Sequence, residues 1–177
     1  MRLEKLNKKE VYLDPLHGYI QVEYKLIYDL IQSKEMQRLK HIKQLGGTTQ
    51  VFPTAEHSRF AHALGTYEIA RCIIEKSDSI KETLSEEEKV VTLCAALLHD
   101  LGHGPFSHAF EMVNLVPHED YTVQFILEDS EVHQILNNVD KNLPKQVADV
   151  ITKKHPNHIM CQIVSSQLDA DRMDYLS

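Results

Sequence analysis

The stretch Leu98-His-Asp-Leu-Gly-His-Gly-Pro-Phe-Ser-His108 is the most informative part of this chain. Its His-Asp pair ends an apolar segment that predicts a buried helix over 90–100, and the glycines and proline after it predict a turn. Packing alone gives no reason for the pair, because burying unpaired polar groups costs roughly 2–7 kcal/mol. Neutral imidazole and ionised carboxylate both bind divalent cations, so the stretch predicts a metal site.

Two further segments offer ligands from other helices, which are needed because neighbouring residues of a helix point about 100° apart. They are His57-Ser-Arg-Phe-Ala-His62 and Asp169-Ala-Asp-Arg-Met-Asp-Tyr175. The predicted metal ligands are His62, His99, Asp100 and Asp171. Such mixed nitrogen and oxygen ligands suit Fe, Mn, Zn or Co better than Ca, and we expect the cofactor to be one of these four metals or Mg. Four protein ligands leave positions open for water and substrate, as hydrolysis requires.

Each of these residues also has a structural explanation when it is taken alone. A single histidine in a helix is more often packed or exposed than a ligand, and the aspartates over 169–174 are equally consistent with a solvated face. A basic stripe is either a solvated helix face or the edge of a nucleotide site or subunit interface; its members are Lys34, Arg38, Lys40, His41 and Lys43. The segments 57–62, 98–108 and 169–175 together favour a metal site, since the needs of packing do not produce that combination.

The composition is that of an ordinary globular protein, with 42% hydrophobic and 25% charged residues among 177. The formal net charge of -7 argues against nucleic acid and anionic membranes as partners. The charged start lacks a signal-peptide pattern, and no apolar run of about 18 residues occurs. Three widely separated cysteines indicate free thiols in a reducing compartment, so we expect a cytoplasmic protein.

Hydrophobic periodicity predicts an all-α fold with a small N-terminal β-hairpin, in one domain over 1–177. The hairpin turns at 14–18 and, with the first helices, forms the part over 1–50, while 51–177 holds the metal-site core. A capping box at Ser85 and Glu88 opens the central helix. Helices are predicted over 24–31, 36–45, 57–76, 85–100, 119–128, 130–138, 144–153 and 158–176, with a polar connector over 77–84. The helical pattern continues to Ser177, which suggests a chain truncated at its C-terminal end.

The order His62 … His99-Asp100 … Asp171 resembles the signature of the HD-domain metal-dependent phosphohydrolases, and it implies an HD-type helical bundle. Further motifs resemble the deoxynucleoside triphosphate triphosphohydrolase branch, which includes bacterial enzymes and the sterile-alpha-motif/HD protein. These motifs are Gln37-Arg-Leu-Lys-His-Ile-Lys-Gln-Leu-Gly46, Phe52-Pro53, 57–62, 98–108, His118-Glu119 and 169–175. The similarity runs from about Val11 to the last residue.

The resemblance implies a reaction in which a deoxynucleoside triphosphate is hydrolysed to a deoxynucleoside and inorganic triphosphate. It implies that Arg59 and Arg172 contact the phosphates, which guanidinium groups bind well. It also implies that Gln44 and Leu45 fit against the deoxyribose and that Tyr175 contacts a phosphate or the sugar. Deoxynucleoside triphosphates are therefore the expected partners.

The departing 5′-oxygen needs a proton, which a histidine with a pKa near 7 supplies. The resemblance implies that the proton donor is His103, His108 or His118, and that Glu119 orients His118. Some relatives are activated by nucleotides bound between subunits, which implies a homo-oligomer. They use an acidic residue near position 32 and an arginine near position 40, where this chain has glutamine and lysine.

Two alternatives to this function stay open. One is another HD phosphohydrolase, acting on nucleoside monophosphates, cyclic nucleotides or alarmones. The other is a catalytically inactive module that binds nucleotides or single strands. The chemical identity of the phosphate product separates the enzymes, and the presence of all four predicted ligands speaks against an inactive site.

Overall fold

Helix α5 (Glu86–Leu98) lies at the centre of the computed structural model, which describes residues 3–106, 108–166 and 169–175. The Ser85 hydroxyl accepts a hydrogen bond from the backbone N–H of Glu88, and the Glu88 carboxylate accepts one from the backbone of Ser85. The predicted capping box is therefore present. Every residue over 90–98 is buried, so α5 is the core helix that its apolar sequence predicts.

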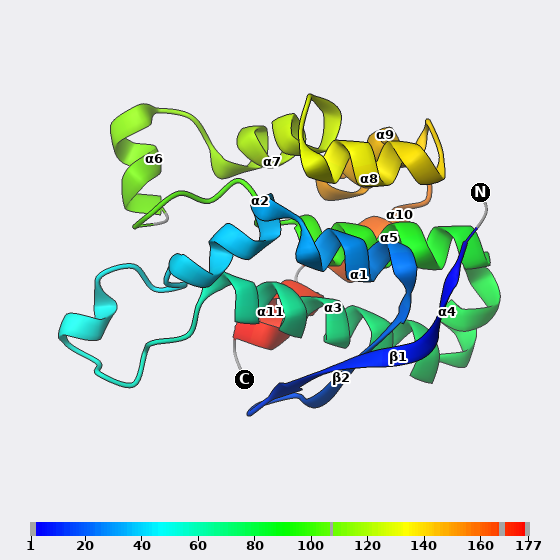
Figure 1. Cartoon of the computed structure of the whole chain (residues 1–177), viewed down its shortest axis with the longest axis horizontal. Coiled ribbons are helices and arrows are strands. Elements are labelled where there is room, and N and C mark those ends of the chain that lie inside the picture. The colour runs from blue at the N-terminus through cyan, green and yellow to red at the C-terminus, as the bar shows by residue number, and fades with distance from the viewer. Residues whose placement is uncertain (1–2, 107, 167–168, 176–177) are drawn as a thin grey trace.

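The helices that surround α5 place three segments of the sequence around one core. Helices α3 (Arg59–Lys76), α9 (Leu143–Ile151) and α10 (His158–Val164) contact α5 directly. Helices α7 (His118–Leu127) and α8 (Glu131–Val139) pack against α9 and lie with it at the top of the view in Figure 1. The short helix α11 (Ala170–Tyr175) packs against α3, although the two are far apart in the sequence.

The predicted hairpin is present as an antiparallel pair of strands, β1 (Lys5–Asp14) and β2 (Gly18–Tyr24). Asp14 pairs with Gly18 at the turn, where the Gly18 φ of 72° favours glycine. Ile20 and Val22 are fully buried and fix one face of the sheet on the helices. Helix α1 (Lys25–Gln32) follows at once, and it buries the apolar stripe Leu26, Ile27, Leu30 and Ile31.

The helix predicted over 36–45 is wrong beyond its first turns. Helix α2 (Lys34–Gln37) passes into a 3-10 turn at Arg38–His41, and Ile42 is extended, with φ −113° and ψ 116°. The carbonyl of Ile42 accepts a hydrogen bond from the backbone N–H of Arg59 at 2.8 Å, so pairing with the chain before α3 replaces the helix. A second 3-10 turn at Thr48–Gln50 lies in the loop that follows.

Three other parts of the chain differ from the predicted helices. The polar connector over 77–84 contains helix α4 (Asp78–Thr83), and helix α6 (His108–Asn114) was not predicted. The predicted helix over 158–176 is two helices, α10 and α11, because Asp169 caps α11 by accepting the Arg172 backbone N–H at 2.7 Å.

The all-α fold class with one hairpin is confirmed, since the described residues form eleven α-helices and a two-stranded sheet. Over that part of the chain, no helix is both long and apolar enough to cross a membrane.

Candidate metal centre and active site

Three separate segments bring the four predicted ligands together. His62 lies in the first turn of α3, His99 and Asp100 directly follow α5, and Asp171 lies in α11. The Nε2 atom of His62 is 3.0 Å from Asp171 Oδ1 and 3.7 Å from Asp100 Oδ2. The Nε2 atom of His99 is 3.5 Å from Oδ1 of both aspartates. Two imidazoles and two carboxylates therefore converge on one small volume.

Hydrogen bonds on the outer sides of the two imidazole rings turn both Nε2 atoms towards this centre. The Nδ1–H of His99 donates to the Ala96 carbonyl at 2.9 Å, and the Nδ1–H of His62 donates to Asp174 Oδ2 at 2.6 Å. Such bonds fix the ring orientation and leave Nε2 as the ligand atom. Both Nε2 atoms are buried, and neither makes a hydrogen bond of good geometry within the described part of the chain. A cation between the rings and the carboxylates fits this arrangement.

The charges at this centre are strongly coupled. Burial alone would lower the pKa of His62, but the nearby carboxylates of Asp171 and Asp174 outweigh burial and raise that pKa to about 9. Burial would raise the pKa of Asp171, yet His62 and His99 hold it well below its usual range. The pKa of Asp100 is likewise lowered, because the facing cationic groups outweigh its burial. A divalent cation would take the place of the proton on His62.

Arg59 begins α3 and is buried beside Asp100. Its Nη1 atom donates to Asp100 Oδ2, so the guanidinium holds one predicted ligand in place. Burial lowers the pKa of Arg59 and the Asp100 carboxylate opposes that shift. The side chain predicted to contact phosphate therefore sits next to the metal centre, already oriented by a carboxylate.

A second cluster of three histidines and Glu111 adjoins the candidate metal centre. The His103 ring stacks on the His118 ring, with centroids 3.6 Å apart. The His108 ring meets the His103 ring edge-on, with centroids 5.0 Å apart. Nε2 of His103 and of His118 lie 3.5 Å and 3.6 Å from Asp100 Oδ1. The predicted proton donors are therefore gathered next to a predicted metal ligand.

The surroundings distinguish the three histidines. His103 is buried, the His118 side chain is 13% exposed and the His108 side chain is 72% exposed. Burial lowers the pKa of His103, although Asp100 opposes the shift. The Nδ1–H of His118 donates to Glu111 Oε1 at 2.7 Å, whereas Glu119 Oε2 is 3.4 Å away.

Glu111 was missed in the sequence because helix α6, which carries it, was not predicted. Its position three residues after His108 is the spacing that places two side chains on one helix face, and that spacing was the available signal. Asp174 lies at the same spacing after Asp171, within one of the segments expected to supply ligands, but its hydrogen bond with His62 was not predicted.

A cavity of about 410 Å³ opens onto both clusters. Arg172 is exposed at its wall, and Gln44 reaches the site because its backbone N–H donates to the His57 carbonyl at 3.0 Å. The Tyr175 side chain lies outside the described residues. The lining residues are Gln44, Leu45, Arg59, Asp100, His103, His108, His118, Glu119, Asp171 and Arg172.

Arg38 departs from the rest of the predicted basic stripe. Its Nη1 donates to the His103 carbonyl at 2.8 Å and its Nη2 to the Leu101 carbonyl, so it anchors the turn after the His-Asp pair. The other members are exposed, namely Lys34, Lys40, His41 and Lys43.

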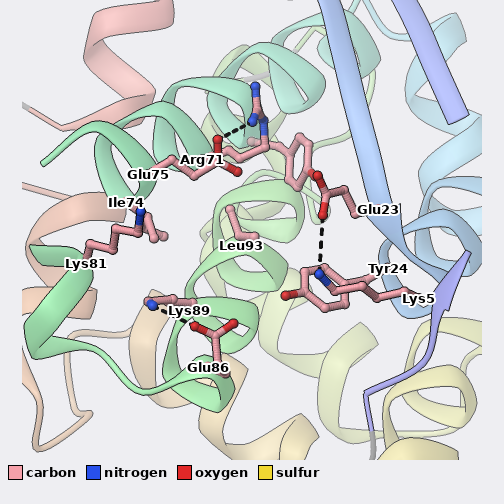
Figure 2. A pocket seen from close by; sticks show the side chains of 11 residues that line it. Lys5, Glu23, Tyr24, Arg71, Ile74, Glu75, Lys81, Glu86, Lys89 and Leu93 are labelled. Atoms are coloured by element: carbon pink, nitrogen blue, oxygen red, sulfur yellow. Dashed lines mark hydrogen bonds and ion pairs between the residues drawn. The ribbon is translucent and has the colours of Figure 1, made fainter. Parts of the chain in front are cut away.

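A separate cavity of about 200 Å³ lies between β2, α3 and α5 (Figure 2). Several of its charged side chains pair with one another, including Lys89 with Glu86 at 2.7 Å and Arg71 with Glu75 at 2.6 Å. None of the predicted ligands lines it. The predicted metal centre therefore lies apart from this cavity.

Known proteins resemble this chain along most of its length. The uncharacterized protein YwfO of Bacillus subtilis is 51% identical over 97% of this chain, which spans 40% of that relative. The deoxynucleoside triphosphate triphosphohydrolase SAMHD1 homolog of Dictyostelium discoideum is 36% identical over 93% of this chain and 34% of its own length. The crystal structure of a phosphohydrolase from Bacteroides thetaiotaomicron matches with a TM-score of 0.84 and 33% identity, over 96% of this chain and 41% of that one.

The HD domain family model matches residues 59–177, a range that includes all four predicted ligands. The chain spans less than half the length of the relatives it matches. From the family match, the shared fold and the named relatives, this chain belongs to the HD-domain phosphohydrolases and is related within them to the deoxynucleoside triphosphate triphosphohydrolases.

Proposed function

We propose that this protein hydrolyses deoxynucleoside triphosphates to a deoxynucleoside and inorganic triphosphate, using a divalent cation held by His62, His99, Asp100 and Asp171. The observation that carries the proposal is the cavity lined by Asp100 and Asp171 of this ligand set together with two arginines and three histidines. Phosphoryl chemistry needs a metal, cations for the phosphates and a proton donor for the leaving oxygen, and each has a matching group here.

The two imidazole nitrogens and the carboxylate oxygens are ligand types that Fe, Mn, Zn and Co accept. A bound divalent cation supplies Lewis-acid polarisation of a phosphate oxygen and lowers the pKa of an attacking water. The protein's own contribution is to hold the ligands rigidly. His62 and His99 are each fixed by an outer hydrogen bond, and Asp100 is fixed by Arg59.

The cavity holds the proposed contacts for both the phosphates and the sugar. Arg172 is exposed at the cavity wall and is a proposed phosphate contact, and Arg59 is buried beside Asp100. Gln44 and Leu45 line the same cavity and are the proposed deoxyribose contacts. Tyr175 remains a proposed contact from the end of α11.

The leaving 5′-oxygen would receive its proton from the histidine cluster. His118 is the strongest choice, because Glu111 accepts from its Nδ1–H while its Nε2 points to the metal centre. His103 supports the His118 ring by stacking. His108 is mostly exposed and would reach a substrate only at the cavity mouth.

The test is incubation of the purified protein with each of the four deoxynucleoside triphosphates and Mn²⁺ or Mg²⁺, followed by chromatography of the products. We expect deoxynucleoside and triphosphate in equal amounts from the wild-type protein. The Asp100→Asn variant, which keeps the side-chain shape and removes the charge, should form neither. Release of orthophosphate or pyrophosphate would instead indicate a different HD phosphohydrolase, and nucleotide binding without any product would indicate an inactive binding module.

A further inference from the structure

The turn of the N-terminal hairpin carries a histidine that reaches the interior of the helical domain. Asp14 Oδ1 accepts hydrogen bonds from the backbone N–H groups of Leu16 and His17, at 2.8 Å and 3.0 Å, and so fixes the turn. The His17 side chain is 12% exposed, and its Nε2 lies 2.5 Å from Asp174 Oδ1 in α11. A loop residue at a strand turn is thus bound to the last described helix.

Asp174 joins this histidine to the metal centre. Its Oδ1 faces His17 and its Oδ2 faces Nδ1 of His62, whose Nε2 faces Asp171. The Asp174 side chain is 9% exposed, so little water competes for its oxygens. One carboxylate therefore takes hydrogen bonds from two imidazoles that come from different parts of the sequence.

Gly65 in the middle of α3 is explained by the same contact. A Cβ atom at this position would lie 1.8 Å from Asp174 Oδ1 and 2.7 Å from His17 Nε2. Glycine inside a helix costs about 1 kcal/mol relative to alanine, so its presence here needs a reason. The His17–Asp174 pair fills the space beside Gly65. The hairpin turn, α3 and α11 therefore meet at this hydrogen bond.

We propose that His17 is a positioning residue for the metal centre, acting through Asp174 to hold the imidazole of His62 with its Nε2 towards the cation. This inference rests on the proposed metal site. A simple anchor for the hairpin would leave cation affinity unchanged when it is removed. Removal of a positioning residue would weaken cation binding, because mutation of an outer hydrogen-bond partner of a metal-binding histidine typically costs about 10- to 100-fold in affinity.

The experiment measures the dissociation constant of Mn²⁺ by calorimetry on the purified chain, with circular dichroism to check folding. We expect His17→Ala to weaken Mn²⁺ binding by about 10- to 100-fold. His17→Gln keeps an N–H at a similar reach and should stay close to wild type. Gly65→Ala, which displaces the pair from the opposite side, should weaken binding as His17→Ala does. His158→Ala, an exposed histidine on α10, is the matched control and should bind Mn²⁺ like wild type.

The result that overturns the proposal is unchanged Mn²⁺ affinity in His17→Ala while Asp100→Asn loses binding. That result would leave the proposed function standing. Equal weakening in His17→Gln and His17→Ala would also overturn it, because the hydrogen bond would not be the cause. If the wild-type chain itself binds no Mn²⁺, the metal site fails, and this proposal fails with it.

Discussion

The imidazole rings of His103 and His118 stack with their planes 15° apart and their centroids 3.6 Å apart. Two positive charges at that separation repel each other, so the stack favours one proton-bearing ring and one neutral ring. Burial lowers the pKa of His103 and so disfavours the charged form of that ring. Glu111 accepts a hydrogen bond from the His118 Nδ1–H, which orients the His118 ring as the proposed proton donor.

We expect His118→Gln to lower kcat for deoxynucleoside triphosphates by about 10²- to 10⁴-fold, the usual contribution of a general acid. Binding of Mn²⁺ should stay within about threefold of wild type, because the four proposed ligands are untouched. Steady-state kinetics at saturating metal, together with a Mn²⁺ titration, checks both parts. A normal kcat would remove His118 from the proton-donor role and leave His103 or His108.

The two glutamates near His118 provide a matched pair. Glu111 Oε1 is 2.7 Å from His118 Nδ1 and Glu119 Oε2 is 3.4 Å away, with the Glu119 side chain 58% exposed. Glu111→Gln should therefore lower kcat by at least about tenfold more than Glu119→Gln. The reverse order in side-by-side kcat measurements would assign the orienting role to Glu119.

The affinity for the cation should rise with pH. The pKa of His62 is raised to about 9, so at neutral pH the cation must displace a proton from that ring. Each displaced proton gives about a tenfold gain in affinity per pH unit up to that pKa. Mn²⁺ titrations at pH 6.5, 7.5 and 8.5 in buffers of different ionisation enthalpy measure both the slope and the proton released. An affinity independent of pH would contradict the arrangement.

The anchoring contact of Arg38 should matter for stability and catalysis more than for metal binding. Arg38→Met removes charged donors from the carbonyls of Leu101 and His103, and such bonds each contribute about 1.5–3 kcal/mol. We expect a lower Tm and a lower kcat, with Mn²⁺ affinity nearly unchanged. Lys145→Met, at an exposed position on α9, is the control. Identical Tm values for the two variants would show that the turn needs no anchor.

Local sequence patterns predicted what depends on local structure. The apolar run before His99 and the Ser85 capping box define α5 without reference to the rest of the chain. The convergence of the ligands was also predictable, because a His-Asp pair at a helix end needs partners from other helices. The predicted helix over 36–45 failed for the opposite reason. Ile42 is extended because Arg59, far along the chain, donates to its carbonyl, and helical periodicity carries no sign of that bond.

The outer parts of the site depend on tertiary contacts in the same way. The sequence predicts His17 only as part of the hairpin turn. The docking of the hairpin on α11 brings its side chain to Asp174. Helix α6 has seven residues and many exposed apolar side chains, so neither its length nor its periodicity marked it as a helix. The hydrogen bond from the His118 Nδ1–H to Glu111, which lies in α6, was therefore not predicted either.

The hydrogen bond between His62 and Asp174 spans 112 positions of sequence, and it forms only when α11 docks on α3. Contacts between such distant residues form late in folding, since a long loop must close first. A chain still emerging from the ribosome would hold the His-Asp pair long before it holds Asp171 and Asp174. Stoichiometric uptake of a cation would therefore report that synthesis has passed α11 and that the domain has closed.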